Sequence, residues 1–357
     1  MQRFIAKIGK GHKGAKDLTW EEAKEAMSAL IEGTASPVQV GAFLMAMRIK
    51  TESISELAAF TATARRYVPP IQAPAVSHLV DLPCYGEKHE TVHVVVAGAL
   101  LAVTAGARVL LHSTDNAAAA STIADVLRGL GIPTEHRPDA AAQTLMETGF
   151  AYLDLALYHP PLARLLDLRQ ELGLQNLAHQ VARMINPVRA PSQLIGVGHP
   201  PYVSKIIEAL RTLGTSRAIV FQGVEGSTEL SISAPTPAHE LRQDRVLPLV
   251  LRPHDINAKL GTFQAMSPAD GPSSSRAEQE AAFVKGVLAN RIRGDRRAWV
   301  VFNAALILYA AGAALSLRHA TPLIQEALDS GAALRTLQTL STTSVDDRAL
   351  FHQTVTA

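Results

Sequence analysis

Residues 1–70 carry apolar positions at the three- and four-residue spacing of short amphipathic helices. Three helix starts are marked by capping boxes, in which a serine or threonine stands three positions before a glutamate or glutamine. The pairs are Thr19 with Glu22, Ser36 with Gln39, and Ser53 with Glu56. Pro37 would take the first position of the second helix, and Gly33 would end the first. This segment is therefore predicted to be an all-helical module.

A proline-rich stretch at residues 68–76 separates this module from the rest, because its three prolines interrupt any helix. Beyond it, short apolar runs alternate with helical patterns near 94–107, 123–132 and 201–213. The runs expected to be strands are 78–82, 108–111, 193–197 and 218–221. This alternation predicts an α/β fold class with a mainly parallel central sheet. We expect a helical N-terminal domain at 1–70, joined by helices from about 160–182, and an α/β domain at 76–357.

Composition narrows the class of protein. Hydrophobic residues make up 47% of the 357 residues and charged residues 18%, which excludes a disordered chain. The single cysteine, Cys84, excludes an internal disulfide, and the N-terminus lacks the apolar core of a signal peptide, so a cytoplasmic location is expected. Residues 299–317 are apolar enough to suggest a membrane span, but Asn303 and many alanines favour a buried helix. No membrane association is expected.

Positive charge is concentrated in two segments, although the formal net charge is only +2. The first, residues 1–16, has no acidic residue, and its glycines favour a flexible arm; its cations are Arg3, Lys7, Lys10, Lys13 and Lys16. The second precedes a helix expected to begin near Ala298, and its cations are Arg291, Arg293, Arg296 and Arg297. Guanidinium groups match phosphate oxygens, so DNA or RNA is the predicted partner, bound with weak sequence selectivity. A solvated tail and an ordinary charged turn remain the alternatives.

The string His89-Glu90-Thr91-Val92-His93 matches the HExxH pattern of zinc hydrolases. On a helix its two histidines would share one face and bind zinc. Gly86 and Pro83 favour a loop here, and no third ligand is evident, so zinc hydrolysis is a minor alternative. Cys84 could act as a nucleophile beside these histidines, but without an orienting third group a buried cysteine is favoured.

The run LTWEEAKEAMSALIEGTASPVQVGAFLMAMRIKTES at residues 18–53 resembles the helical N-terminal domain of the anthranilate phosphoribosyltransferase family. The similarity extends to about residue 317. It implies the nucleoside phosphorylase/phosphoribosyltransferase fold, with phosphoribosyl pyrophosphate and Mg²⁺ bound in a cleft between the two domains. It also implies that Arg169, in the string RQELG, is the family's acceptor-side arginine.

The family's donor motifs are altered in this chain. Its glycine-rich GTGGD loop corresponds to PCYGE, in which Pro83 lacks an N–H and Tyr85 blocks close approach of a phosphate. Its NIST helix start reads HVVV at 93–96, and its KHGN motif with a following arginine reads LHSTD at 111–115. Its aspartate–glutamate metal pair is Thr228-Glu229. The residues that still correspond to the family's active-site motifs are expected to have structural roles, and they are Gly86, Glu87, His112, Arg169 and Glu229.

A scaffold that keeps its fold but loses its phosphate site resembles the YbiB-type paralogues of the family, which are homodimeric nucleic-acid-binding proteins. We therefore expect a non-catalytic nucleic-acid-binding homodimer that needs no cofactor and transfers no phosphoribosyl group. The alternative is a phosphoribosyltransferase with a rebuilt site, acting on anthranilate or another aromatic acceptor. Under that alternative, the resemblance implies phosphoribosyl pyrophosphate and Mg²⁺.

Overall fold

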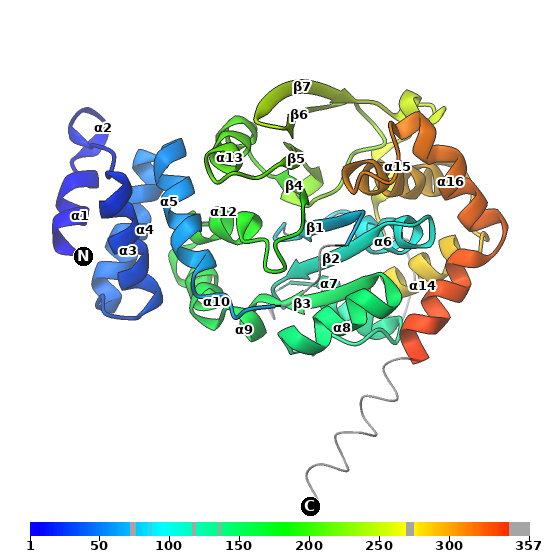
Figure 1. The fold of residues 1–357 in the computed structure, drawn as a ribbon, viewed down its shortest axis with the longest axis horizontal. Coiled ribbons are helices and arrows are strands. Elements are labelled where there is room, and N and C mark those ends of the chain that lie inside the picture. The colour runs from blue at the N-terminus through cyan, green and yellow to red at the C-terminus, as the bar shows by residue number, and fades with distance from the viewer. Residues whose placement is uncertain (72–75, 87, 116–118, 135–136, 269–274, 343–357) are drawn as a thin grey trace, which may run out of the picture.

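The computed structural model describes residues 1–71, 76–86, 88–115, 119–134, 137–268 and 275–342. Five N-terminal helices form one end of the elongated molecule (Figure 1). They are α1 (Gln2–Ile8), α2 (Gly11–Gly14), α3 (Trp20–Ile31), α4 (Pro37–Lys50) and α5 (Ile54–Arg65). All three predicted capping boxes form, and Pro37 lies in the first turn of α4. The prediction of a helical module is confirmed.

A seven-stranded sheet forms the centre of the rest of the chain, in the order β3-β2-β1-β4-β5-β6-β7. The strands are β1 (Leu79–Pro83), β2 (Arg108–Ser113), β3 (Phe150–Asp154), β4 (Ser192–Val197), β5 (Arg217–Gln222), β6 (Thr236–Arg242) and β7 (Arg245–Leu251). β1 to β5 pair in parallel, and β6 and β7 form an antiparallel hairpin at one edge. The predicted α/β fold class with a mainly parallel sheet is confirmed. β3, β6 and β7 were not among the predicted strands.

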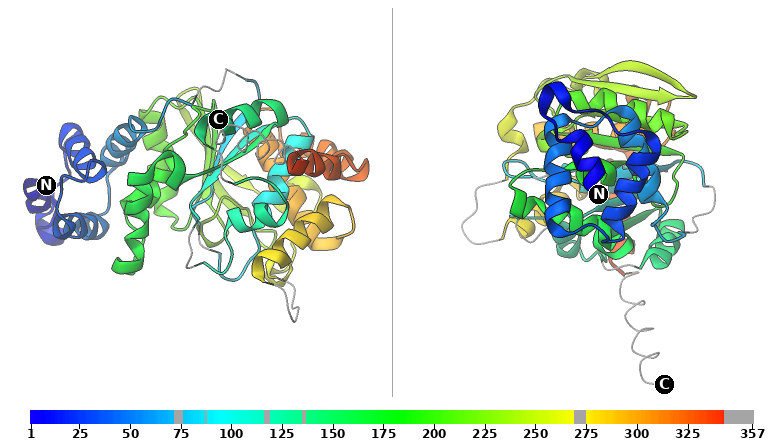
Figure 2. Two further views of the ribbon diagram at one scale, coloured as in Figure 1. Left: turned by 90° about the horizontal axis from the view of Figure 1, so that it is seen from below. Right: turned by 90° about the vertical axis from the view of Figure 1, so that its left-hand side faces the viewer.

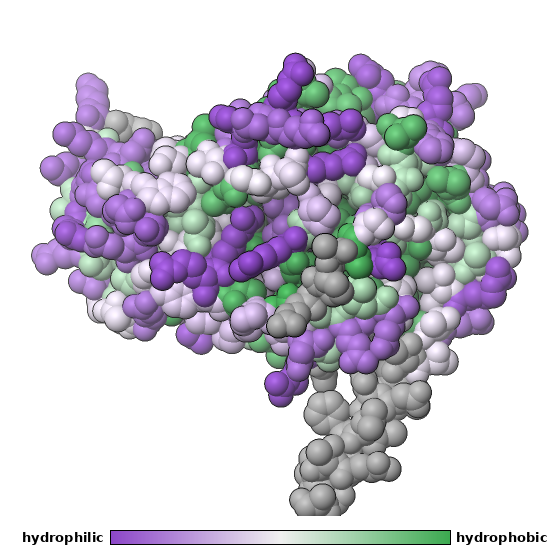
Figure 3. All heavy atoms as spheres, in the orientation of Figure 1, coloured by the Kyte–Doolittle hydropathy of each residue, from purple (hydrophilic) through white to green (hydrophobic). Residues whose placement is uncertain are grey.

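Helices cover both faces of this sheet (Figures 1 and 2). One face packs against α6 (Val94–Thr104), α7 (Ile123–Gly129), α14 (Arg276–Leu288), α15 (Gly294–Ala310) and α16 (Leu317–Asp329). The apolar stretch at 299–317 mostly lies in α15, whose residues from Trp299 to Ala310 are buried. No helix in the described part of the chain is long and apolar enough to cross a membrane. Polar side chains cover much of the helical end of the molecule on the face shown in Figure 3.

The opposite face carries α8 (Pro138–Thr148), α9 (Leu155–Tyr158), α10 (Pro160–Asp167), α11 (Arg169–Leu172), α12 (Leu177–Met184) and α13 (Pro201–Thr212). Alternate residues of a strand point to opposite faces. Val80 and Leu82 of β1 therefore belong to the core around α6 and α15, whereas Leu79 belongs to a core that also contains residues of α3, α4, α5, α10 and α12. This second core joins the N-terminal helices to the sheet. The domain boundaries given above remain predictions.

The N-terminal basic segment is not a flexible arm. It forms α1 and α2, and Phe4 and Ile8 are buried in the second core. Glycine spacing suggested flexibility, but two apolar residues one turn apart give the segment a buried face. That burial outweighs the glycines' preference for irregular backbone.

Glu56 is the buried polar centre of the helical module. Its carboxylate accepts hydrogen bonds from the backbone N–H groups of Leu18 (2.8 Å) and Ser53 (2.8 Å), and from Lys50 Nζ (2.7 Å). One side chain therefore completes a capping box, holds the chain before α3 and neutralises a nearly buried lysine. Removing it leaves the N–H groups of Leu18 and Ser53 without this acceptor, whereas Lys50 keeps its bonds to Asp17 and to Thr51 O.

Replacing Glu56 by alanine should lower the free energy of unfolding by about 3 kcal/mol, because the N–H groups of Leu18 and Ser53 lose their acceptor and Lys50 loses one of its two carboxylate partners. Urea unfolding followed by circular dichroism measures this loss. Glu21→Ala is the control, because Glu21 lies on the surface in an exposed pair with Lys24 and should contribute less than about 0.5 kcal/mol. Equal losses for the two variants would contradict the structural role of Glu56.

Candidate active site

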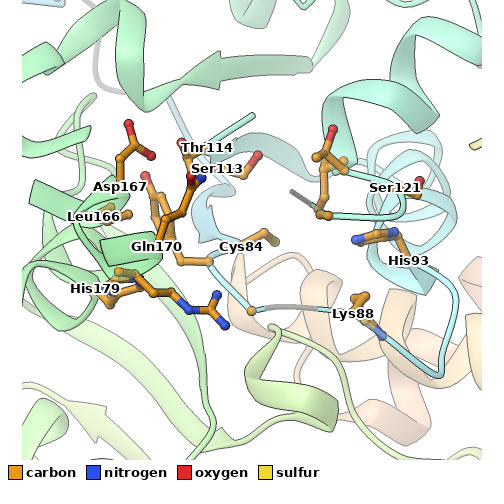
Figure 4. Close-up of a pocket in the computed structure, with 16 residues that line it drawn as sticks. Cys84, Lys88, His93, Ser113, Thr114, Ser121, Leu166, Asp167, Gln170 and His179 are labelled. Carbon is orange, nitrogen blue, oxygen red and sulfur yellow. The ribbon is translucent and has the colours of Figure 1, made fainter. Parts of the chain in front are cut away.

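An open cleft lies where β1 and β2 end and α6 begins (Figure 4). One wall carries Asp167, Arg169, Gln170 and His179 from the helices between β3 and β4. The facing wall carries Lys88, His93 and Ser121, and Cys84, Ser113 and Thr114 lie between the two walls. Ligands of parallel α/β proteins bind at the carboxyl ends of the strands. The cleft has this position.

The loop after β1 packs tightly against the turn at residues 224–227. A Cβ atom on Gly86 would lie 2.4 Å from the backbone N of Ser227, so only glycine fits there. Cys84 is buried beside it, and burial, reinforced by the Glu229 carboxylate, raises the pKa of its thiol. This thiol is a packed core group and not a reactive nucleophile. Glu87 lies outside the described residues.

The N-terminus of α6 is filled by carboxylates of the chain itself. Glu229 Oε1 accepts the N–H of Val95 (3.0 Å), and Glu280 Oε2 accepts the N–H of His93 (2.8 Å). Glu280 Oε2 also lies 2.6 Å from His93 Nδ1, and its Oε1 accepts from Arg276 Nε (2.7 Å). Burial works to raise the pKa of Glu280, but these contacts outweigh it and lower the pKa to about 2. In many proteins a helix N-terminus binds phosphate; here it is already occupied.

A third carboxylate fills the loop before α6. The backbone N–H groups of His89 (2.7 Å) and Glu90 (2.9 Å) donate to Glu225 Oε1, and that of Thr91 (3.0 Å) donates to Oε2. The Thr91 hydroxyl also donates to Oε2. Burial works to raise the pKa of Glu225, but these hydrogen bonds lower it overall. Successive N–H groups of this kind form an anion-binding nest, and Glu225 is its anion.

Lys88 neutralises Glu229. Its Nζ donates to Glu229 Oε2 and to Thr91 Oγ1 (2.7 Å), and both charged side chains are almost fully buried. The neighbouring residue, Thr228, donates its hydroxyl to Pro83 O and accepts from Gly196 N (3.1 Å). The positions corresponding to the metal pair are therefore engaged in bonds within the chain. These residues do not fit the Mg²⁺ that the resemblance implied.

Arg183 ties the floor of the cleft together. Its guanidinium group is fully buried and donates to four backbone carbonyls, those of Gly196 (3.1 Å), His179 (2.8 Å), Tyr85 (3.0 Å) and Gly226 (3.3 Å). Burial lowers its pKa to about 10, so the group stays charged at neutral pH. One side chain thus joins α12, β4 and the two loops beneath the cleft.

His112 belongs to a buried network on the side of the sheet that faces the helical domain. Its Nδ1 lies 2.8 Å from Tyr85 Oη and 3.0 Å from Tyr158 Oη. Its Nε2 lies 3.1 Å from Asp81 Oδ1, close enough for an ion pair but not aligned as a hydrogen bond. Asp81 Oδ2 accepts from Gln193 Nε2 (3.0 Å). The tyrosine that replaces a family glycine therefore supports the core.

Arg169 lies in the cleft wall, and its role as an acceptor-side arginine stays a prediction from the resemblance. Partial burial lowers its pKa, which leaves the guanidinium group charged at neutral pH. His179 beside it is uncharged, because burial and the charge of Arg183 lower its pKa to about 3. The acceptor side of the cleft thus keeps one cation with a polar neighbour.

The HETVH string does not form a zinc-binding helix. Residues 88–92 are irregular, α6 begins only at Val94, and His93 is held by Glu280. No three histidine, cysteine, aspartate or glutamate side chains converge on a metal position within the described residues. The two histidines therefore do not share a helix face as the zinc motif requires, because the glycine-containing loop delays the helix start.

The two basic segments lie at opposite ends of the molecule, with α1 and α2 at one end and the start of α15 at the other (Figures 1 and 2). Arg3 pairs with Glu25 and Lys7 with Glu22. The remaining lysines of the first segment are exposed: Lys10, Lys13 and Lys16. The surface expected to be purely basic is therefore partly neutralised by acids of α3.

The second segment is also engaged with the fold. Arg296 donates to Ser267 O (2.7 Å), and Arg297 pairs with Asp329 (3.2 Å). Arg293 donates to Asn290 Oδ1 (2.8 Å), and its side chain and that of Arg291 are exposed. Three of the four arginines of the predicted cluster are thus bonded to other residues of the chain around the start of α15.

Several residues of the cleft could not have been chosen from the sequence. Glu225 and Glu280 stand far along the chain from the loop and helix that they cap. Arg183 follows a stretch of apolar helix and gave no signal. Lys88 directly precedes the HETVH string. From the sequence, its charge counted only as evidence against a zinc-binding helix, and its partner Glu229 was not predicted.

Comparison with known proteins agrees with the fold. Residues 2–68 match the glycosyl transferase family helical bundle domain, and residues 78–334 match the glycosyl transferase family a/b domain. Anthranilate phosphoribosyltransferase of Thermomicrobium roseum is 31% identical over 328 residues, which cover 91% of this chain and 92% of that protein. Anthranilate phosphoribosyltransferase 1 of Ralstonia nicotianae is 31% identical over 89% of this chain and 91% of its own.

Solved structures show the same architecture. Anthranilate phosphoribosyltransferase from Thermus thermophilus superimposes with a TM-score of 0.84 at 26% identity, covering 96% of this chain and 98% of its own. The Saccharomyces cerevisiae enzyme in complex with PRPP and Mg has a TM-score of 0.81 at 16% identity, covering 97% of this chain and 98% of its own. The latter likeness concerns the fold alone.

These findings overturn the expected function. The interpretation as a non-catalytic nucleic-acid-binding protein is wrong, because relatives that share about 31% of residues along nearly the whole chain are named as enzymes. The error came from treating altered donor motifs as loss of activity while counting surface cations as a binding site. The alternative, a phosphoribosyltransferase with a rebuilt site, agrees better with the comparisons.

Both family models match, and together they cover the helical module and most of the α/β part. The relatives match over about nine-tenths of the chain. The chain therefore belongs to the glycosyl transferase family that combines a helical bundle domain with an α/β domain and that includes the anthranilate phosphoribosyltransferases.

Proposed function

We propose that this protein is a phosphoribosyltransferase that acts on anthranilate or another aromatic acceptor in the cleft beside α6. The observation that carries the proposal is the position of Arg169. It lies in the cleft wall, and the family resemblance implies that it is the acceptor-side arginine. A guanidinium group binds a carboxylate through two parallel hydrogen bonds, which suits an aromatic acid.

The two halves of the cleft differ in how far they depart from the family. We call the wall that carries Arg169 the acceptor half and the wall around the start of α6 the donor half. The acceptor half keeps Arg169, whereas the donor half contains two ion pairs within the chain, Lys88 with Glu229 and His93 with Glu280. The finer resemblance to YbiB-type paralogues depends on this altered donor half. A changed donor half is equally expected of an enzyme that holds its donor by different contacts, and this interpretation agrees with the named activity of the relatives.

Arg169→Ala should raise KM for the aromatic acceptor about 30-fold, because a hydrogen bond to a charged group contributes about 2 kcal/mol. The assay supplies phosphoribosyl pyrophosphate with anthranilate or with a panel of aromatic acids, and follows consumption of the acceptor. Arg164→Ala is the matched control, because Arg164 lies on the neighbouring helix α10 and is exposed away from the cleft.

Two results would contradict the proposal. One is the absence of transfer by the parent protein to every acid in the panel. The other is an equal effect of Arg169→Ala and Arg164→Ala on KM, because the cleft arginine would then have no special part in binding the acceptor.

We also propose that the protein is a homodimer joined through α4. This helix exposes apolar side chains at the spacing of a helix-pairing seam, and they are Val38, Ala42, Met45 and Ile49. Val38 is 82% exposed and Ile49 58%. A second copy of the same helix presents the same stripe, so the two can cover each other about a two-fold axis.

Ile49→Glu should convert the dimer to a monomer at micromolar concentration, because the seam would then bury two unpaired charges. Sedimentation velocity measures the mass, and circular dichroism checks that the fold is unchanged. Leu315→Glu is the control, because Leu315 is 85% exposed but lies in the α/β part. A monomeric parent protein, or dissociation by both variants alike, would contradict an interface on α4.

A further inference from the structure

We propose that the ammonium group of Lys88 takes the place of a divalent metal ion, so that the cleft binds the anionic part of its substrate without Mg²⁺. The inference deepens the proposed function and rests on it, because it concerns the donor half of the same cleft. It assigns a positioning role to Lys88, which lies between the positions of the family motifs compared above.

The ammonium group is held on three sides. Nζ donates to Glu229 Oε2 and Thr91 Oγ1, and it lies 5.7 Å from the centroid of the Trp299 ring. The side chain of Lys88 is 1% exposed and that of Glu229 0%. Side chains with this many fixed contacts cannot swing into solvent, so the positive charge is a permanent part of the cleft wall.

A buried carboxylate needs a positive partner, and for Glu229 this partner could be a bound metal ion or a cationic side chain. Its other oxygen is taken by Val95 N at the start of α6. Because Lys88 is attached to the same chain, its effective concentration at Glu229 far exceeds that of free Mg²⁺ in solution. A metal ion would have to displace the ammonium group before it could reach this oxygen.

The surrounding oxygens give a metal little help. Magnesium prefers about six oxygen ligands in near-octahedral geometry. Both oxygens of Glu225 accept N–H groups of the loop, and both oxygens of Glu280 are bonded to His93 or Arg276. Thr228, at the second position of the metal pair, bonds to Pro83 and Gly196. The oxygen shell that would surround the ion is already used within the protein.

The ligand chemistry follows from this charge. An ammonium group carries one positive charge and donates directional hydrogen bonds, whereas Mg²⁺ carries two charges and bridges several oxygens. Lys88 is among the residues that line the cleft, and its ammonium group lies in the cleft wall, bonded to Glu229 and Thr91. The donor half is therefore suited to phosphoryl oxygens that arrive without a coordinated metal.

The test follows the thermal unfolding of the full-length protein in EDTA and in millimolar Mg²⁺, each with and without pyrophosphate as the probe. The unfolding midpoint of the parent protein should be the same in EDTA as in Mg²⁺, both without pyrophosphate and with it. Lys88→Met should unfold several degrees lower, because Glu229 is left buried without a cation. Mg²⁺ should raise the midpoint of this variant in a saturable way, since the metal can now occupy the vacated place.

Two further variants make the result specific. Lys88→Met combined with Glu229→Gln should show no response to Mg²⁺, because the carboxylate that would bind the ion is gone. Lys24→Met removes the same charge from an exposed pair and should behave as the parent protein in both conditions. If Lys88→Met does not fold in EDTA, recovery of folded protein on refolding in Mg²⁺ supports the proposal.

Saturable stabilisation of the parent protein by Mg²⁺ would overturn the inference. So would a Lys88→Met variant that Mg²⁺ neither stabilises nor refolds while the double variant folds. These measurements use no acceptor, so they are independent of the transfer assay. Transfer by the parent protein that requires Mg²⁺ would reject the role of Lys88 and leave the proposed function standing, whereas absent transfer with the expected Mg²⁺ behaviour would reject only the proposed function.

Discussion

The first turn of α6 is buried, and the N–H groups at its start need acceptors that water cannot supply. This constraint governs the cleft. Glu229 and Glu280 supply the acceptors, and Lys88 and Arg276 balance their negative charges. Glu225 accepts the N–H groups of the preceding loop. Charge balance is thus achieved within the chain, at the place where a phosphate and its counterions could otherwise bind.

The consequence is an asymmetric cleft. On one side, carboxylates and cations are paired, so that half is rigid and close to neutral. On the other side, Arg169 and Asp167 lie in the cleft wall with His179, which burial holds uncharged. An acceptor acid would meet a preformed cation, whereas a donor must accommodate a surface whose hydrogen bonds are already formed. Such pre-organisation lowers the entropic cost of binding but narrows the choice of ligand.

Much of the fold was predictable because it depends on local signals. Capping boxes, proline punctuation and apolar periodicity identified α3 to α5 and the four strands β1, β2, β4 and β5. The hairpin of β6 and β7 was missed because β7 is an exposed edge strand with a proline at its centre, which weakens the strand pattern.

The candidate site was much less predictable. Its motif positions were located from the family resemblance, but their partners come from distant parts of the chain. The bond from Val95 to Glu229 spans 134 positions and that from His93 to Glu280 spans 187. Substitutions at a motif therefore indicated what had been lost and not what had replaced it. Likewise, Arg3 and Lys7 formed a basic stripe in the sequence, yet α3 brings acids to both.

Arg183 has a mechanical consequence. Because its guanidinium group is bonded to α12, to β4 and to both loops below the cleft, these elements must move as a single rigid unit. Separating these elements would leave the buried guanidinium charge of Arg183 without hydrogen-bond acceptors, at a cost of several kcal/mol. A change in the width of the cleft would therefore be a displacement of one of its walls, such as α10 and α11, which carry Asp167 and Arg169, relative to the elements that Arg183 joins.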